Sequence, residues 1–214
     1  MEGSFYDKKY FQWQKDIGAF GGKANQIKFL KLISGNGQKV LDFGCGGGFL
    51  ISSFSQNIDR YGVEINDVAR ASAEEKGVKC FKRSADLPEE KFDLIISNNA
   101  LEHTENPLQE LKNLRKSLVP GGKICLVVPL DNKIFAYKPN NKDYHLFSWS
   151  PMNLGNLLDC AGFKVLESYP YVHKWVPKYN LFVKFFGWKL FHLACRVYGQ
   201  IERSWCQVRA VGIK

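Results

Sequence analysis

Apolar runs of strand length alternate with segments of helical period along most of the chain. Near-continuous apolar runs are typical of parallel strands that helices cover on both faces. The strands that this pattern predicts are residues 39–43, 60–65, 78–83, 92–97, 123–128, 163–169 and 206–213. The helices predicted around them are residues 25–33, 49–54, 67–76, 107–118 and 151–161. The alternation predicts an α/β fold built on a doubly wound sheet.

Composition and charge limit the classes of protein that fit. The chain has 214 residues, 45% of them hydrophobic, which is enough for one domain with a sizeable core. The formal net charge is +9, but no block of five like charges occurs. We therefore expect no nucleic-acid partner from charge alone. The six cysteines have spacings that suit neither zinc nor a disulfide framework, and we expect no metal.

A glycine-rich loop follows the first predicted strand. It reads G-C-G-G-G from Gly44 to Gly48, and Asp42 lies two residues before it. Glycines at a strand–helix junction allow a tight turn and a close approach of the backbone to a ligand. Free N–H groups at the start of the next helix add hydrogen-bond donors. The loop is a candidate ligand site, and a purely structural turn is the alternative if it is considered alone.

An acidic residue at the end of the second predicted strand strengthens the case for a nucleoside ligand. Glu64 follows Gly44 by 20 residues. In a doubly wound sheet this position lies beside the ribose, where a carboxylate accepts hydrogen bonds from both hydroxyls. The same charge repels a 2′-phosphate, which argues against an NADP-type ligand.

Taken together, these residues resemble a known family. D-F-G-C-G-G-G, from Asp42 to Gly48, is similar to the D-x-G-C-G-x-G motif of class I S-adenosylmethionine-dependent methyltransferases, and in particular of the small-molecule types 11 and 23. The fourth-strand segment ends in L-E-H, as in these families. The other similar segments, in order, are residues 61–64, 92–103, 114–122 and 145–163.

The resemblance implies a Rossmann-like sheet of seven strands, mostly parallel with an antiparallel last strand, and helices on both faces. Together with the residue pattern outside the shared motifs, it predicts a single methyltransferase domain in four parts. These are an N-terminal helical lid (1–38), a cofactor-binding core (39–169), a basic aromatic helical insert (170–205) and the last strand (206–214). Glycines at positions 18–22 would serve as hinges of the lid, and a helix packed on the sheet edge is the alternative for this region.

The resemblance also implies that S-adenosylmethionine is the cofactor. The glycine loop would hold its methionine part, Glu64 its ribose and Ile65 its adenine. Asp86 would face the adenine amino group, although capping of a solvated turn is the alternative. The full set of residues implied in cofactor binding is Asp42, Phe43, Gly44, Cys45, Gly46, Gly48, Glu64, Ile65, Ala85, Asp86, Leu87, Asn98 and Asn99.

Catalysis needs few dedicated groups, because the sulfonium cofactor is already activated and the enzyme mainly aligns two molecules. An oxygen acceptor would benefit from a base, and histidine suits that role near neutral pH. His103 follows the fourth strand, and His145 lies in the long connection after the fifth. Both are candidate catalytic residues. Structural hydrogen bonding to the loop backbone is the alternative role for His103, and His145 lies where substrate contacts are expected.

Residues 177–199 form a basic, aromatic segment outside the shared motifs. As a helix it would align five apolar side chains, namely Phe182, Phe186, Leu190, Leu193 and Val197. Such a helix suits peripheral contact with a membrane, and cover over the substrate pocket or a dimer contact are the alternatives. We expect a cytoplasmic location, with contact to the inner face of a membrane left open.

The sequence therefore favours a methyltransferase that acts on a small-molecule, glycan or lipid-linked acceptor by in-line displacement, with oxygen as the favoured methylated atom. A catalytically inactive S-adenosylmethionine-binding regulator and a nicotinamide-dependent oxidoreductase are the alternatives. Nucleic-acid amino methylation fits poorly, because S-N-N-A at residues 97–100 lacks the Asn/Asp-Pro-Pro-aromatic run expected after the fourth strand.

Overall fold

The computed structural model describes residues 8–55, 57–130, 137 and 144–214, with side chains from residue 17 onward. The strands are β1 (Gln38–Phe43), β2 (Ile58–Val63), β3 (Lys79–Phe81), β4 (Phe92–Asn98), β5 (Leu118–Pro129), β6 (Lys164–Tyr171) and β7 (Gln207–Ile213). The α-helices are α1 (Lys8–Asn25), α2 (Phe49–Ser52), α3 (Asp67–Glu74), α4 (Pro107–Ser117), α5 (Pro151–Cys160) and α6 (Tyr179–Ile201).

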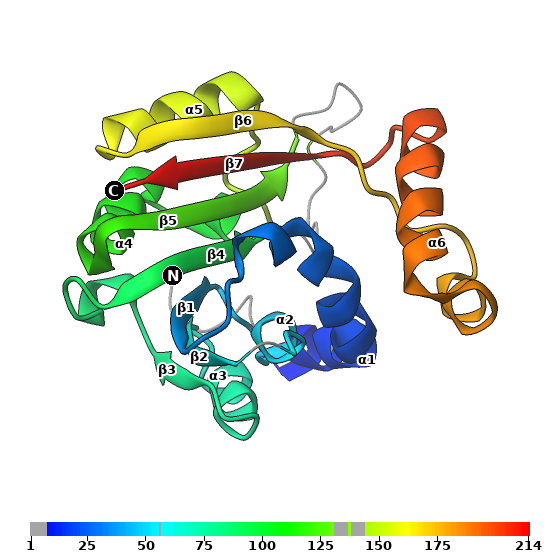
Figure 1. Cartoon of the computed structure of the whole chain (residues 1–214), viewed down its shortest axis with the longest axis horizontal. Helices are drawn as coiled ribbons and strands as arrows, with labels where there is room; N and C mark the ends of the chain where they lie inside the picture. The colour runs from blue at the N-terminus through cyan, green and yellow to red at the C-terminus, as the bar shows by residue number, and fades with distance from the viewer. Residues whose placement is uncertain (1–7, 56, 131–136, 138–143) are drawn as a thin grey trace.

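One seven-stranded sheet organises the described chain, in the order β3-β2-β1-β4-β5-β7-β6 (Figure 1). Strand β7 runs antiparallel to both of its neighbours, and the other pairings are parallel. The order reverses at β1 and β4, so the carboxyl ends of these strands flank the crevice where ligands bind in such sheets. The predicted fold class, including the antiparallel last strand, is confirmed.

Helices cover both faces of the sheet because its central strands are apolar on both sides. Helices α4 and α5 bury Leu111 and Leu158 against one face. Helices α2 and α3 bury Ile51 and Ala73 against the other. Pro107 occupies the first turn of α4, and Ser150 caps α5 in a reciprocal pair with Asn153. These caps satisfy orphan N–H groups and set where the two helices begin.

The N-terminal region differs from the sequence prediction. The helix predicted at residues 25–33 is replaced by two 3-10 turns, η1 (Gln26–Lys28) and η2 (Leu30–Leu32), and the long helix α1 precedes them. Helix α1 runs unbroken through Gly18 and Gly22. A Cβ on Gly22 would lie 2.2 Å from the carbonyl oxygen of Phe49. These glycines therefore let α1 approach α2 closely, which gives them a packing role.

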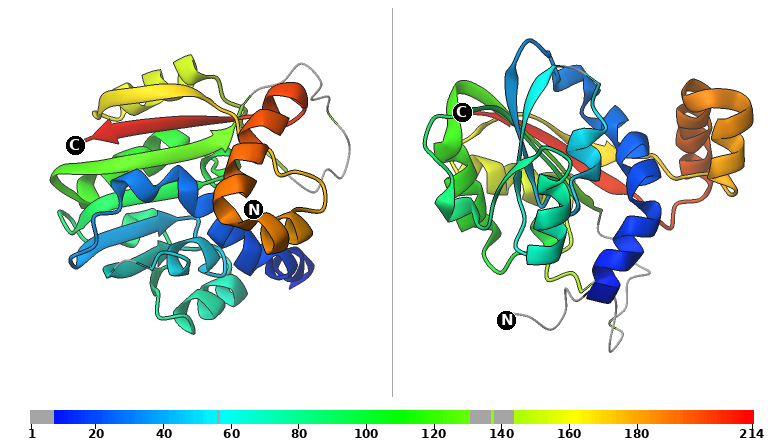
Figure 2. Two further views of the ribbon diagram at one scale, coloured as in Figure 1. Left: turned by 45° about the vertical axis from the view of Figure 1, so that its right-hand side comes forward. Right: turned by 90° about the horizontal axis from the view of Figure 1, so that it is seen from below.

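Helix α6 stands beside the end of the sheet, joined to it by the segments after β6 and before β7 (Figure 2). Gly187 interrupts its helical geometry with a φ of 72°. The helix buries Phe191 and Cys195 against Phe20 of α1 and the neighbouring Trp175. Among the residues that the structure describes, no helix has both the length and the apolar character needed to cross a membrane.

The apolar face predicted for this helix is largely exposed, and it covers no pocket among the residues that the structure describes. Phe186, Leu190, Leu193 and Val197 are each more than half exposed, whereas Phe182 is only partly exposed. The opposite face is also apolar and is the one that packs. The sequence could not separate these faces, because both carry large hydrophobic side chains.

Candidate functional site

The glycine loop turns sharply between β1 and α2 at the carboxyl edge of the sheet. Gly44, Gly46 and Gly48 all have positive φ values of 75°, 52° and 75°. Residues with a Cβ adopt this conformation at a cost, so the loop depends on glycine. The backbone N–H groups of Gly44 and Cys45 both donate to the carbonyl of Val63, which ties the loop to the end of β2.

The space around the loop also leaves no room for a side chain at Gly44. A Cβ on Gly44 would lie 2.3 Å from the Cβ of Ala100, which follows β4. This contact brings the loop and the segment after β4 together on one side of the crevice. The predicted loop residues Phe43 and Cys45 are buried, whereas Gly44 is exposed.

Glu64 lies directly after β2 and links two parts of the crevice. One carboxylate oxygen, Oε2, accepts a hydrogen bond from the N–H of Gly46 at 2.8 Å. The other, Oε1, accepts from the N–H of Asn66 at 2.8 Å. Burial raises the pKa of Glu64, and the two backbone hydrogen bonds act in the opposite direction. Each oxygen keeps a second lone pair for a hydroxyl donor.

Asp42 lies at the end of β1, 2% exposed. Burial, followed by the nearby charge of Glu64, raises the pKa of Asp42 well above its usual value. Two neighbouring carboxyl groups at one strand edge form a region that favours a cationic ligand, since a positive charge offsets both their repulsion and their desolvation.

The residues predicted to surround an adenine lie on the outer side of the crevice. Ile65 is 60% exposed, which is unusual for an isoleucine that directly follows a buried strand. Ala85 and Asp86 are exposed in the 3-10 turn η3 (Ser84–Asp86), and Leu87 is half-buried. The exposed members of this set thus lie directly after β2, at Ile65, and in η3, which follows β3.

Asn98 and Asn99, at the end of β4, belong to a polar network that the sequence did not indicate. The amine of Lys28 donates to Asn98 Oδ1 at 2.8 Å and to Gln207 Oε1 at 2.7 Å. Gln207 in turn donates from Nε2 to Asn99 Oδ1 at 2.7 Å. The network joins η1, β4 and β7, which are far apart in sequence, across the centre of the sheet edge.

Lys28 is the functional candidate that sequence analysis missed. Its side chain is buried, and desolvation lowers its pKa to about 7. The nearby Cys125 and Glu102 act in the opposite direction and do not offset the burial. A lysine within an apolar stretch gives no local signal, because its partners are 70 and 179 residues away.

A cavity of about 300 Å³ opens beside this network. Its lining combines the polar groups of Lys28, Asn98 and Gln207 with the indoles of Trp175 and Trp205. A few convergent polar groups among aromatic walls are typical of small-molecule sites, and this volume is at the lower end of the usual range.

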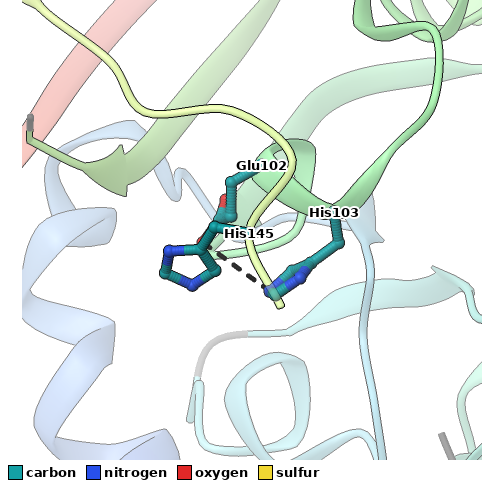
Figure 3. Close-up of side chains that lie close together, drawn as sticks. All are labelled: Glu102, His103 and His145. Carbon is teal, nitrogen blue, oxygen red and sulfur yellow. Dashed lines mark ion pairs between the residues drawn. The ribbon is translucent and has the colours of Figure 1, made fainter. Parts of the chain in front are cut away.

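The two predicted catalytic histidines lie together. His103 belongs to the 3-10 turn η4 (Leu101–His103) after β4, and the ring of His145 lies 4.9 Å from its ring, centroid to centroid. Glu102, the neighbour of His103, is fully buried, and its burial raises its pKa to about 8. Figure 3 shows the three side chains converging between the turn after β4 and the connection that follows β5.

Comparison with known proteins gives the family. The sequence profile described as "Methyltransferase domain" matches residues 19–168. An Aliivibrio fischeri ubiquinone biosynthesis O-methyltransferase is 34% identical over 99 residues, 41% of this chain and 42% of the relative. The corresponding Cereibacter sphaeroides protein is 31% identical over 115 residues, 47% of this chain and 45% of the relative. The matches thus span less than half the length of these relatives.

Solved structures share the fold at low sequence identity. An Archaeoglobus fulgidus S-adenosylmethionine-dependent methyltransferase has a TM-score of 0.65 at 16% identity, with 97% of this chain and all of that chain covered. A Haemonchus contortus phosphoethanolamine N-methyltransferase in complex with S-adenosylmethionine also has a TM-score of 0.65, at 14% identity, over 99% of this chain and 60% of that one. The family match argues against the alternative of a nicotinamide-dependent oxidoreductase. The chain belongs to the methyltransferase-domain family.

Proposed function

We propose that this methyltransferase moves the methyl group of S-adenosylmethionine to an oxygen atom of a small-molecule acceptor. The observation that carries the proposal is the joint position of Asp42 and Glu64. Two buried or half-buried acidic groups meet the glycine loop at the carboxyl edge of β1 and β2. This arrangement suits a ligand that combines a positive charge with a ribose.

The residues of the crevice fit the parts of this cofactor in order. The loop of Phe43, Gly44, Cys45, Gly46 and Gly48, with Asp42, would hold the methionine part. Glu64 would accept hydrogen bonds from the ribose hydroxyls through its remaining lone pairs. The exposed side chain of Ile65 would pack on the adenine, with Ala85, Asp86 and Leu87 beside it. When bound, the cofactor supplies an activated methyl group.

The acceptor is proposed to occupy the cavity lined by Lys28, Asn98, Asn99 and the two tryptophans. The cavity adjoins the end of β4, next to the segment that contacts Gly44. Aromatic walls suit a ring-shaped acceptor, and the lysine amine suits an oxygen that gains negative charge. His103 and His145, which lie together in the segments after β4 and β5, are proposed to promote the loss of the acceptor proton.

The relatives whose names specify ubiquinone biosynthesis favour oxygen as the methylated atom. We further propose that the acceptor is linked to a lipid and that the protein contacts the surface of a membrane. Helix α6 supports both, because it exposes seven large apolar side chains: Leu181, Phe185, Phe186, Leu190, Leu193, Val197 and Ile201.

The charge around this exposed face favours an anionic lipid surface. No acidic residue occurs between residues 168 and 201, whereas Lys174, Lys178, Lys184, Lys189 and Arg196 all do. Amphipathic helices with large apolar side chains and a basic surround lie in the interfacial region of membranes. An apolar dimer contact would have no need for the excess of basic residues.

A labelled-methyl assay tests the proposed activity. Purified protein is incubated with methyl-labelled S-adenosylmethionine and fractionated small-molecule and lipid extracts, and labelled products are identified by mass spectrometry. We expect an O-methylated product that forms with the wild-type chain and not with Glu64→Ala. Label that appears only on protein or nucleic acid would contradict the proposal.

A further inference from the structure

The cluster of Glu102, His103 and His145 has the composition and the spacing of a metal site. Potential ligand atoms of the three side chains all lie within 4.8 Å of one another. Nε2 of His103 lies 4.0 Å from Oε1 of Glu102, which is too long for a hydrogen bond between them. The three side chains therefore lie close together without a hydrogen bond between Glu102 and His103 (Figure 3).

Glu102 gives the independent sign that a ligand belongs in this cluster. Its side chain is 0% exposed, and neither carboxylate oxygen has a hydrogen-bond partner among the described residues. The nearby amine of Lys28 already donates to Asn98 and Gln207. A buried carboxyl group without a partner is costly, and such groups are normally paired, hydrogen-bonded or bound to a metal.

Backbone hydrogen bonds position the segment of His145 against the turn that carries Glu102 and His103. The N–H groups of Leu146 and Phe147 both donate to the carbonyl of Glu102, at 2.9 and 3.2 Å. The segment with His145 is thereby fixed to the same turn that carries Glu102 and His103. Loop and turn form one unit, although 42 residues separate His103 from His145.

We infer that Glu102, His103 and His145 bind a divalent transition-metal ion, with zinc or manganese as the fitting class. Two imidazoles and one carboxylate suit these ions, whereas magnesium and calcium favour sets made of oxygen alone. Ligand atoms around a tetrahedral zinc lie about 3.4 Å apart, given bonds of about 2.1 Å. The ligand atoms here lie within 4.8 Å of one another, so side-chain rotations that close each gap by up to about 1.4 Å would complete the site.

Three protein ligands leave one coordination position open, as in catalytic metal sites. The cluster follows Ala100, which contacts Gly44 of the glycine loop, so it lies next to the proposed cofactor site. The assignment of the open position to the acceptor rests on the proposed function, but the ion site itself does not. There the ion would polarise the acceptor hydroxyl, whose proton leaves to solvent as the oxygen–methyl bond forms and the carbon–sulfur bond breaks.

The experiment measures metal binding directly. The untagged full chain is stripped with a chelator and titrated with Co²⁺, and the visible d–d absorption reports coordination by nitrogen ligands. Zn²⁺ is then added as a competitor. We expect one Co²⁺ per chain, displaced by Zn²⁺, with affinity lowered at least tenfold in His145→Gln and in Glu102→Gln. His192→Gln, a histidine outside the cluster, should retain the wild-type affinity.

His145→Gln guards against loss of folding, because it changes a partly exposed loop residue. S-adenosylmethionine binding, measured on the same samples, separates the two proposals. A folded wild-type chain that binds the cofactor but shows no stoichiometric Co²⁺ or Zn²⁺ binding overturns the metal site alone. Equal affinity in wild type and in the variants also overturns it. Metal binding without cofactor binding contradicts the proposed function and leaves the ion site supported.

Discussion

The carboxylate of Glu64 accepts a hydrogen bond from the N–H of Gly46 at 2.8 Å, and this bond connects the ends of β1 and β2. The same side chain holds Asn66, the residue that caps α3. Glu64 therefore supports the loop as well as facing the proposed ribose site. Its two roles are separable by experiment, because one affects stability and the other affects affinity.

Replacing Glu64 should weaken both the binding of the cofactor and the stability of the fold. Glu64→Ala leaves two backbone N–H groups without their acceptor, and we expect the free energy of unfolding to fall by about 1–3 kcal/mol. Loss of the ribose contacts should reduce S-adenosylmethionine affinity at least tenfold in calorimetry. Glu75→Ala, at an exposed glutamate beyond α3, is the control and should change neither quantity.

The need for glycine at position 44 has a matched control within the chain. Gly44 and Gly77 have similar φ values of 75° and 79°, but a Cβ would meet Ala100 only at Gly44 and nothing within 4 Å at Gly77. Both alanine variants carry the cost of positive φ. Gly44→Ala should lose about 1–3 kcal/mol more than Gly77→Ala, because it also overpacks. Equal losses in urea denaturation would show that the contact with Ala100 has no energetic effect.

Lys28 should make stability depend on pH above neutrality. The folded amine loses its proton above about pH 7, whereas the unfolded amine keeps it until about 10.5. The unfolded state then binds more protons, so stability rises with pH by up to about 1.4 kcal/mol per unit between these values. Below pH 7 both states are protonated, and the contribution of Lys28 is constant.

Lys28→Met serves as the reference for that measurement. Glu102 and Cys125 also titrate near Lys28 and are present in both proteins. The difference in unfolding free energy, wild type minus variant, should therefore increase from pH 7 to pH 9. A difference that stays flat or decreases would mean that the buried amine keeps its proton in the folded state.

Membrane contact through α6 should depend on both its apolar face and its charge. We expect Phe186→Ser, Leu190→Ser and Leu193→Ser together to abolish most binding to vesicles that contain anionic lipid. Met152→Ser, at a methionine 76% exposed on α5, is the control for an unrelated apolar side chain. Wild-type binding should weaken with salt and with neutral vesicles. Unchanged partitioning of the triple variant in a sedimentation assay would rule out this surface.

The features that sequence analysis predicted share a local cause. Positive φ demands glycine at positions 44, 46 and 48, and a buried parallel strand demands an apolar run. Both signals lie within a few residues of the feature they report. The acid at position 64 follows from the strand ends, since parallel strands bring their carboxyl ends to one edge.

What the sequence could not provide depends on contacts between distant segments. The pairing of Lys28 with Gln207 joins residues 179 positions apart. The ligand atoms of Glu102 and His145 come close together only when the connection after β5 folds onto η4. The packed face of α6 is set by Phe20 and Trp175, which lie outside the helix. The hydrophobic periodicity of a single segment cannot predict contacts with residues outside that segment.

Equilibrium binding of S-adenosylmethionine, compared with NAD⁺, tests the central claim most directly. Isothermal titration of the purified chain should give one S-adenosylmethionine site, lost or weakened at least tenfold in Glu64→Ala, and no NAD⁺ binding at the same concentrations. A wild-type chain that is folded but binds no S-adenosylmethionine, or binds NAD⁺ more tightly, would contradict the account.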